Sequence, residues 1–282
     1  MELSPETRTS ELGQIYGFAR AIENRLLRIY NLPENPQGYS HISRNQFDLT
    51  ARFSGVIPEV IGNNLHLEIR IDKKTTRILS QASSLYDLLL NKKSRLALLI
   101  LIEEVGHYVD LQSHFLRFGT VEDGFRTVTE GMVLLSQKKV LESLESDPLD
   151  NKARKGLDIA KRKVDEEITL RKNLHPEDDP KKRYKIGVEL FEGLLDNIQN
   201  LPHDILKNLQ LMSMSELLEF IVSNYTFLIQ QTSGEITQLD VPILRRVRRN
   251  KLAELRKTQE KYQNNRNAVL VFRYNLENKQ GN

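Results

Sequence analysis

The sequence predicts an α+β fold that is mainly helical, with one small sheet, and three observations support this class. Apolar residues recur at the three- and four-residue spacing of amphipathic helices over most of the chain, beginning with 12–29. Segment 65–72 (LHLEIRID) alternates strictly between apolar and polar residues, as a strand with one buried face does. Segment 96–102 (LALLILI) is apolar on all sides, so the helix that contains it must lie in a core.

Composition narrows the class of protein. The 282 residues include 41 Lys and Arg against 38 Asp and Glu, a net charge of +3, which does not suit a protein that mainly binds nucleic acid. The absence of Cys excludes disulfides, thiolate zinc sites, iron–sulfur clusters and cysteine nucleophiles. No secretory signal opens the chain and no apolar run is long enough to cross a bilayer, so we expect a cytoplasmic protein with no membrane association.

The elements of the first quarter of the chain follow from periodicity and from helix breakers. The helix over 12–29 ends where two prolines and a glycine follow it. Residues 39–64 are expected to be irregular, because glycines and a proline interrupt them. The strand over 65–72 comes next, and a short helix is expected over 78–90.

The rest of the chain is expected to be mostly helical. Further helices are expected over 94–118, 128–144, 154–172 and 186–198, with a polar loop over 175–182. Ser213 and Glu216 form a capping box ahead of another apolar stripe, whereas 267–275 (NAVLVFRYN) resembles a strand. We therefore divide the chain into an N-terminal part, 1–150, and a mainly helical C-terminal part, 151–282.

A basic helix is expected over 242–262, where eight Lys and Arg against two Glu give a net charge of +6. Such a run is usually a solvated face, although it can also contact phosphates. It has no interleaved aromatic residues to stack on bases. We therefore expect a surface helix with weak polyanion contact and no nucleic acid as a partner.

The residues that indicate chemistry are Glu103-Glu104-Val105-Gly106-His107, at the polar end of the most apolar helix. Residues four apart lie on the same helical face, so Glu103 and His107 can be directed at one point. Glu104 lies beside that point. A zinc hydrolase helix needs this geometry, with two metal ligands at i and i+4 and a carboxylate at i+1 that takes a proton from water.

At this point the sequence resembles the zincin metallopeptidases, and in particular the gluzincins. EEVGHYVD is similar to their HExxH helix with the first His replaced by Glu, and Glu130-Gly131 is similar to the segment that holds their third ligand. Tyr184-Lys-Ile-Gly187 is similar to a Tyr-x-x-Gly helix of several such peptidases. The resemblance implies a small sheet whose edge strand, here 65–72, pairs with an extended polypeptide substrate.

The resemblance also implies roles for single residues. His107, Glu130 and Glu103 would be the metal ligands, Glu104 the general base, and Zn²⁺ the cofactor. His66, on the solvated face of the strand, and Tyr184 are candidate substrate contacts.

The replacement of His by Glu103 leads to two hypotheses. Two carboxylates and one neutral imidazole cancel the +2 charge of the ion, so zinc would be a weaker Lewis acid and harder cations would compete better. The first hypothesis is a metallopeptidase with an altered ligand set. The alternative is a catalytically inactive pseudoenzyme of the zincin fold, which binds a protein partner or acts as a regulatory subunit.

Other interpretations of the same residues stay open. Thr127 and Glu130 fit a capping box, which would explain Glu130 without a metal. Glu104-x-x-His107 matches half of a di-iron pair, although the sequence has no second ExxH. His114 lies on the face of His107 but about 10 Å further along the helix axis.

Overall fold

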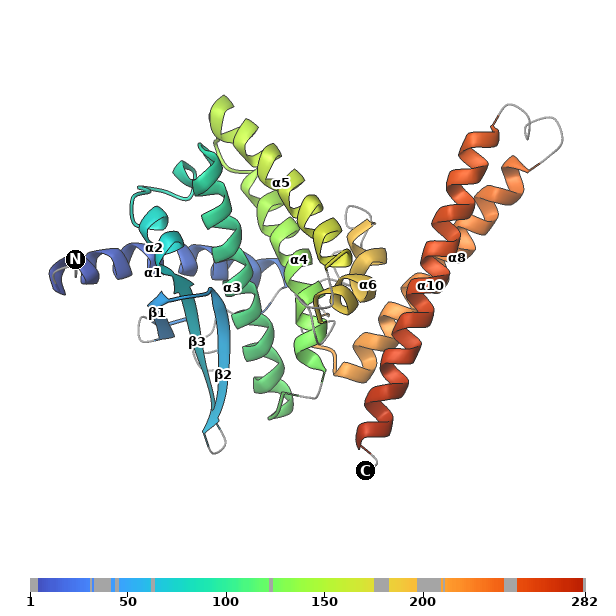
Figure 1. Cartoon of the computed structure of the whole chain (residues 1–282), viewed down its shortest axis with the longest axis horizontal. Helices are drawn as coiled ribbons and strands as arrows, with labels where there is room; N and C mark the ends of the chain where they lie inside the picture. Colours follow the sequence, from blue (N-terminus) through green and yellow to red (C-terminus); the bar gives the residue numbers. More distant parts are fainter. Residues whose placement is uncertain are drawn as a thin grey trace. The chain divides into compact units, whose positions relative to one another are not determined.

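The computed structural model confirms the fold class, because it is mainly helical with one three-stranded sheet (Figure 1). It describes residues 5–30, 46–61, 64–121, 124–174, 183–196, 211–240 and 248–280, together with Leu32, Ile42, Ser43 and Leu209. These residues belong to two compact units. The first comprises Met1–Val121, Met132–Arg171 and Pro202–Leu211, and the second comprises Glu122–Gly131, Lys172–Leu201 and Met212–Asn282.

The first unit begins with helix α1, Pro5–Ile29, which confirms the predicted helix and begins earlier than predicted. Its apolar stripe is the buried face, since Ile15, Ile22 and Leu26 are at most 1% exposed. This stripe packs toward α3, Lys92–Phe118, the long helix of the same unit.

Residues 39–64 are not irregular as predicted, because two strands lie among them. These are β1, Phe47–Ala51, and β2, Gly55–Ile61. Proline breaks most strands, but Pro58 lies in an edge strand, where one side of the backbone needs no N–H donor. Most described side chains of both strands are partly exposed, so the sequence lacks the alternation that reveals a strand with a buried face.

The predicted strand is confirmed as β3, Asn64–Asp72, and its apolar face is the buried one. Leu67, Ile69 and Ile71 are 0% exposed. The strand order is β1-β3-β2, with β1 parallel and β2 antiparallel to β3. The expectation that 65–72 is an edge strand is therefore wrong, since both edges of β3 are paired, and β2 is an edge of the described sheet.

A helix follows β3 without a loop. It is α2, Lys73–Leu79, so the helix predicted over 78–90 is wrong in its bounds, and only the short 3-10 turn η2, Asp87–Leu89, lies in the later part of that range. Asp72 sets the early start, because its Oδ1 accepts hydrogen bonds of 3.0 Å from the backbone N–H groups of Lys74 and Thr75.

The helices predicted next are confirmed, as α3, α4, Phe125–Leu144, and α5, Asn151–Lys172. α3 begins after Asn91, whose side chain accepts a hydrogen bond from the N–H of Ser94. It ends at Gly119, whose φ of +72° is a left-handed conformation that glycine adopts without steric cost.

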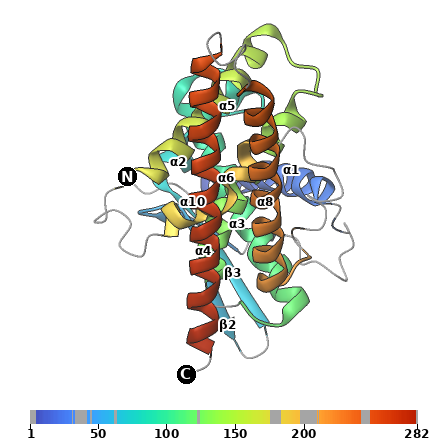
Figure 2. The ribbon, with the colours of Figure 1, turned by 90° about the vertical axis from the view of Figure 1, so that its right-hand side faces the viewer.

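The second unit contains α6, Arg183–Asp196, α8, Met214–Leu239, and α10, Arg249–Gln280. The capping box of Ser213 and Glu216 is confirmed at the start of α8. α8 and α10 lie side by side, as Figures 1 and 2 both show.

The strand predicted over 267–275 is wrong, since these residues continue α10. The run of apolar residues is β-branched and aromatic, which resembles a strand, but its burial is that of a helix. Tyr262, Asn265 and Val269 are buried at helical spacing, whereas Leu270 and Val271 are 43% and 59% exposed.

Several predictions fall outside the described residues. These are the polar loop over 175–182 and the first part of the basic helix over 242–262, of which the structure describes α10 from Arg249. In the part of the chain that the structure describes, we find no helix of sufficient length and apolarity to cross a membrane.

Candidate metal centre

Three predicted ligands, Glu103, His107 and Glu130, come together in the structure. One ligand atom of each lies within 4.8 Å of the other two, and all three side chains are half-buried. No other group of three His, Asp or Glu side chains in the described ranges meets this condition. Glu103 and His107 lie one turn apart on α3, as predicted, and Glu130 lies on α4, a continuous helix that from Met132 on belongs to the first unit.

The separation of these atoms suits a metal ion. Ligand atoms about 2.0–2.2 Å from a tetrahedral zinc ion are roughly 3.3–3.6 Å apart. Oxygen ligands 2.3–2.6 Å from a calcium ion can be about 4.6–5.2 Å apart when they lie on opposite sides of it. The upper limit of 4.8 Å is compatible with either geometry, so the group could hold a divalent cation.

Close approach between α3 and α4 helps to direct these side chains at one another. A Cβ atom on Gly106 would lie 2.7 Å from Cγ2 of Val133 and 3.6 Å from Cβ of Ser136, so only glycine allows this crossing without a shift. Val133 follows Glu130 by three residues and therefore lies on the same face of α4. The glycine inside the EEVGH motif thus brings the face of α4 that holds Glu130 toward α3.

Within the second unit, Glu130 lies against α6. A Cβ atom on Gly187 would lie 2.5 Å from the carbonyl oxygen of Thr127 and 2.8 Å from Cβ of Glu130. A Cβ atom on Gly131 would lie 2.3 Å from the carbonyl oxygen of Gly187. The Tyr-x-x-Gly segment noted in the sequence therefore lies against Glu130 through its glycine.

The capping-box interpretation of Glu130 is wrong. α4 begins at Phe125, so Thr127 lies inside the helix and not ahead of it, and its N–H donates to the carbonyl of Gly124 at 2.8 Å. Glu130 is consequently a residue of the second helical turn, where no capping role explains it.

Glu103 has a partner that sequence reasoning missed, namely Arg171 in the last turn of α5. Nη2 of Arg171 donates to Oε1 of Glu103, and Nε2 of Gln137 donates to Oε2 of Glu103 at 3.4 Å. Only 6% of the Arg171 side chain is exposed. α5 is so rich in charges that no sequence signal separates this buried arginine from its solvated neighbours.

The other predicted site residues do not join the ligand group. Glu104, the predicted general base, follows Glu103 on α3 and is 6% exposed. His66 is exposed on β3, where it pairs in register with Glu59 of β2. Tyr184 is 37% exposed on α6, one turn before Gly187.

His114 lies in the core of the first unit and is 1% exposed. Burial lowers the pKa of His114 to about 4, so its imidazole is neutral at pH 7. Its ring packs on that of Phe118, with ring centroids 4.7 Å apart. It therefore does not replace the histidine missing from the motif.

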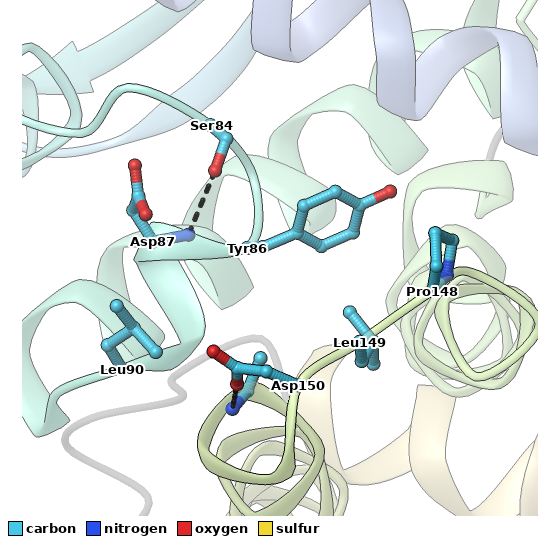
Figure 3. Close-up of a pocket in the computed structure, with 8 residues that line it drawn as sticks. Ser84, Tyr86, Asp87, Leu90, Pro148, Leu149 and Asp150 are labelled. Carbon is cyan, nitrogen blue, oxygen red and sulfur yellow. Dashed lines mark hydrogen bonds between the residues drawn. The ribbon is translucent and has the colours of Figure 1, made fainter.

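The first unit also contains a pocket, shown in Figure 3. It is lined by Ser84, Tyr86, Asp87, Leu90, Pro148, Leu149, Asp150 and Ala153. Two of its polar side chains cap the starts of helical segments, since Ser84 Oγ accepts from the N–H of Asp87 and Asp150 Oδ1 accepts from that of Ala153. These contacts stabilise local structure and indicate no chemistry.

Comparison of the chain with protein-family models, with curated protein sequences and with solved structures gave no match. The functional assignment therefore depends on the residues and the geometry described above.

Proposed function

We propose that this protein is a zincin-like metallopeptidase with an altered ligand set, in which Glu103, His107 and Glu130 hold a divalent cation. One observation supports this most strongly. Three side chains chosen from the sequence, one of them on a different helix, have ligand atoms within 4.8 Å of one another. When bound, the cation would act as a Lewis acid that polarises the scissile carbonyl and lowers the pKa of a water molecule.

Glu104 would move the proton. Its carboxylate follows the first ligand on α3, in the position from which a general base takes a proton from the attacking water. The same carboxyl group, once protonated, would donate to the leaving amine. Its burial excludes bulk water, which strengthens its electrostatic influence on the reacting groups.

The substrate would bind along β2 rather than β3. β2 packs with α3 in the first unit and is an edge strand among the described residues, so its outer edge is our candidate for pairing with an extended polypeptide. Main-chain pairing would provide affinity with little dependence on the substrate side chains.

The donor set is compatible with more than one divalent cation. Histidine suits zinc, whereas two carboxylates suit harder cations such as manganese or calcium. Zn²⁺ is our first candidate because of the His107 imidazole and the half-buried position of the group.

The test is metal binding by purified protein from which metal has been removed with a chelator. We expect one Zn²⁺ or Mn²⁺ per chain, and we expect His107→Ala and Glu130→Gln each to weaken binding by at least about tenfold. His66→Ala is the matched control, because this exposed histidine lies outside the group. Hydrolysis of an unstructured protein such as casein should then require the ion and Glu104. The proposal fails if the folded wild type binds none of Zn²⁺, Mn²⁺ and Ca²⁺.

An inactive relative of such peptidases is the second candidate, and the contact between Arg171 and Glu103 favours it. The guanidinium of Arg171 donates to the carboxylate of Glu103, so this carboxylate has a cationic partner without a metal. In this case the folded protein would bind polypeptides but not cleave them, and Glu104→Gln would leave its binding unchanged.

A further inference from the structure

The position of Arg171 suggests more than a structural ion pair. Its Nε donates to Oε1 of Glu167 at 2.9 Å on its own helix, while Nη2 reaches Glu103 on α3. With 6% of its side chain exposed, the guanidinium has lost most of its water, which is costly unless charged partners replace that water. One of the carboxylates that contact it, that of Glu103, is a candidate metal ligand.

The contact between Arg171 and Glu103 changes the net charge around the candidate metal centre. The usual set of two neutral imidazoles and one carboxylate has a charge of about −1. Glu103 and Glu130 bring −2, and the guanidinium of Arg171, which Glu167 shares, offsets part of that charge. The sequence alone shows only the excess carboxylate, because Arg171 is 68 residues away from Glu103.

We propose that Arg171 is a resident cation that offsets the extra carboxylate of Glu103 and thereby limits the affinity of the centre for a divalent cation. This inference rests on the proposed function. Arg171 does not touch the reacting atoms, so it is a positioning residue that acts through its contact with Glu103 and through its own charge near the ion. Since the guanidinium and the ion share the same carboxylate, each weakens the binding of the other.

The test is the dissociation constant for Zn²⁺, and separately for Mn²⁺, measured by calorimetric titration of chelator-treated protein at fixed pH and ionic strength. Arg171→Gln removes the charge and keeps a hydrogen-bonding side chain, and should bind Zn²⁺ at least about tenfold more tightly than wild type. Arg171→Lys keeps the charge, and its dissociation constant should stay within about threefold of wild type.

A matched control separates this effect from a general loosening of α5. Asp165→Asn breaks the 2.8 Å ion pair between Asp165 of α5 and Lys138 of α4, which does not involve Glu103. Its dissociation constant for Zn²⁺ should equal that of wild type. A change as large as that in Arg171→Gln would mean that any lost ion pair on α5 produces the effect, and would overturn the inference.

A second pair of variants covers the case in which Arg171→Gln alone does not fold. Glu103→His leaves Arg171 beside a neutral ligand, whereas Glu103→His combined with Arg171→Gln has neither charge. We expect the double variant to bind Zn²⁺ at least about tenfold more tightly than Glu103→His.

The outcomes separate this inference from the proposed function. If wild type binds and removal of the Arg171 charge leaves the dissociation constant unchanged in both pairs, the inference alone is wrong. If wild type binds no ion but Arg171→Gln does, Arg171 excludes the metal, which supports the inference and the inactive relative together. If none of the variants binds Zn²⁺ or Mn²⁺, the metal centre is wrong and the inference with it.

Discussion

The close crossing of α4 and α6 predicts that Gly187→Ala damages both stability and the metal centre. The added methyl group would lie 2.5 Å from the carbonyl oxygen of Thr127, 2.8 Å from Cβ of Glu130 and 3.1 Å from the backbone nitrogen of Gly131. Ordinary contact begins near 3.4 Å, so the two helices must separate by almost 1 Å. Two of these three atoms belong to the backbone, which cannot rotate away as a side chain can.

The expected cost follows from this overlap. Overpacking of a tight contact costs about 1–3 kcal/mol, and alanine in a helix interior regains at most about 1 kcal/mol relative to glycine. Because the closest atom belongs to the backbone, we take the upper part of this range, about 2–3 kcal/mol, and expect a net loss of about 1–2 kcal/mol, with Glu130 displaced and Zn²⁺ bound more weakly. Gly234→Ala in α8 is the matched control, since its added methyl group meets nothing within 4 Å and should stabilise the protein by about 0.5–1 kcal/mol.

Urea unfolding followed by circular dichroism measures both variants against wild type, and calorimetric titration measures Zn²⁺ binding. Gly187→Ala should unfold at a lower urea concentration than wild type, and Gly234→Ala at a higher one. Equal stabilities of the two alanine variants would refute the close crossing. A destabilised Gly187→Ala that still binds Zn²⁺ with wild-type affinity would refute the claim that α6 positions Glu130.

Three further predictions concern the site, the core and a helix end. His107→Ala should weaken Zn²⁺ binding at least about tenfold while His66→Ala leaves it unchanged, as measured by competition with a chelator dye; equal losses would contradict the ligand assignment. The pKa of His114 falls from 6.5 to about 4 on burial, so the unfolded chain binds its proton first and stability should decrease as pH falls from 6.5 to 4, by at most about 3 kcal/mol. Urea unfolding at several pH values would measure this slope, and an equal slope in His114→Gln would refute the assignment. Ser213→Ala removes the capping box of α8 and should cost about 1 kcal/mol in urea unfolding, whereas Ser213→Gly should cost only a few tenths; no loss for Ser213→Ala would contradict the cap.

Elements in which apolar residues recur with a regular spacing could be predicted from the sequence. α3 and β3 have one-sided or all-round apolar patterns, and such patterns depend only on residue spacing along the chain. The two weaker strands and the end of α10 were predicted wrongly. β1 and β2 bury too little of either face for a sequence pattern to reveal them, and the β-branched run of 267–275 lies in a helix that buries Val269.

In the candidate site, too, some features could be predicted from the sequence and others could not. Glu103, Glu104 and His107 follow from the sequence, because positions i, i+1 and i+4 have set directions on any helix. Glu130 was predicted only through a resemblance, and the distance of its ligand atom from theirs is a property of the helix crossing at Gly106.

By itself, the sequence determined that a core helix directs an acid and an imidazole at one point with a second acid beside them, because local spacing sets those directions. Only the tertiary structure decided that β3 lies in the middle of the sheet and that Arg171 reaches Glu103. The physical reason is that strand order and contacts across 68 residues arise from the packing of whole elements, which no local pattern of residues encodes.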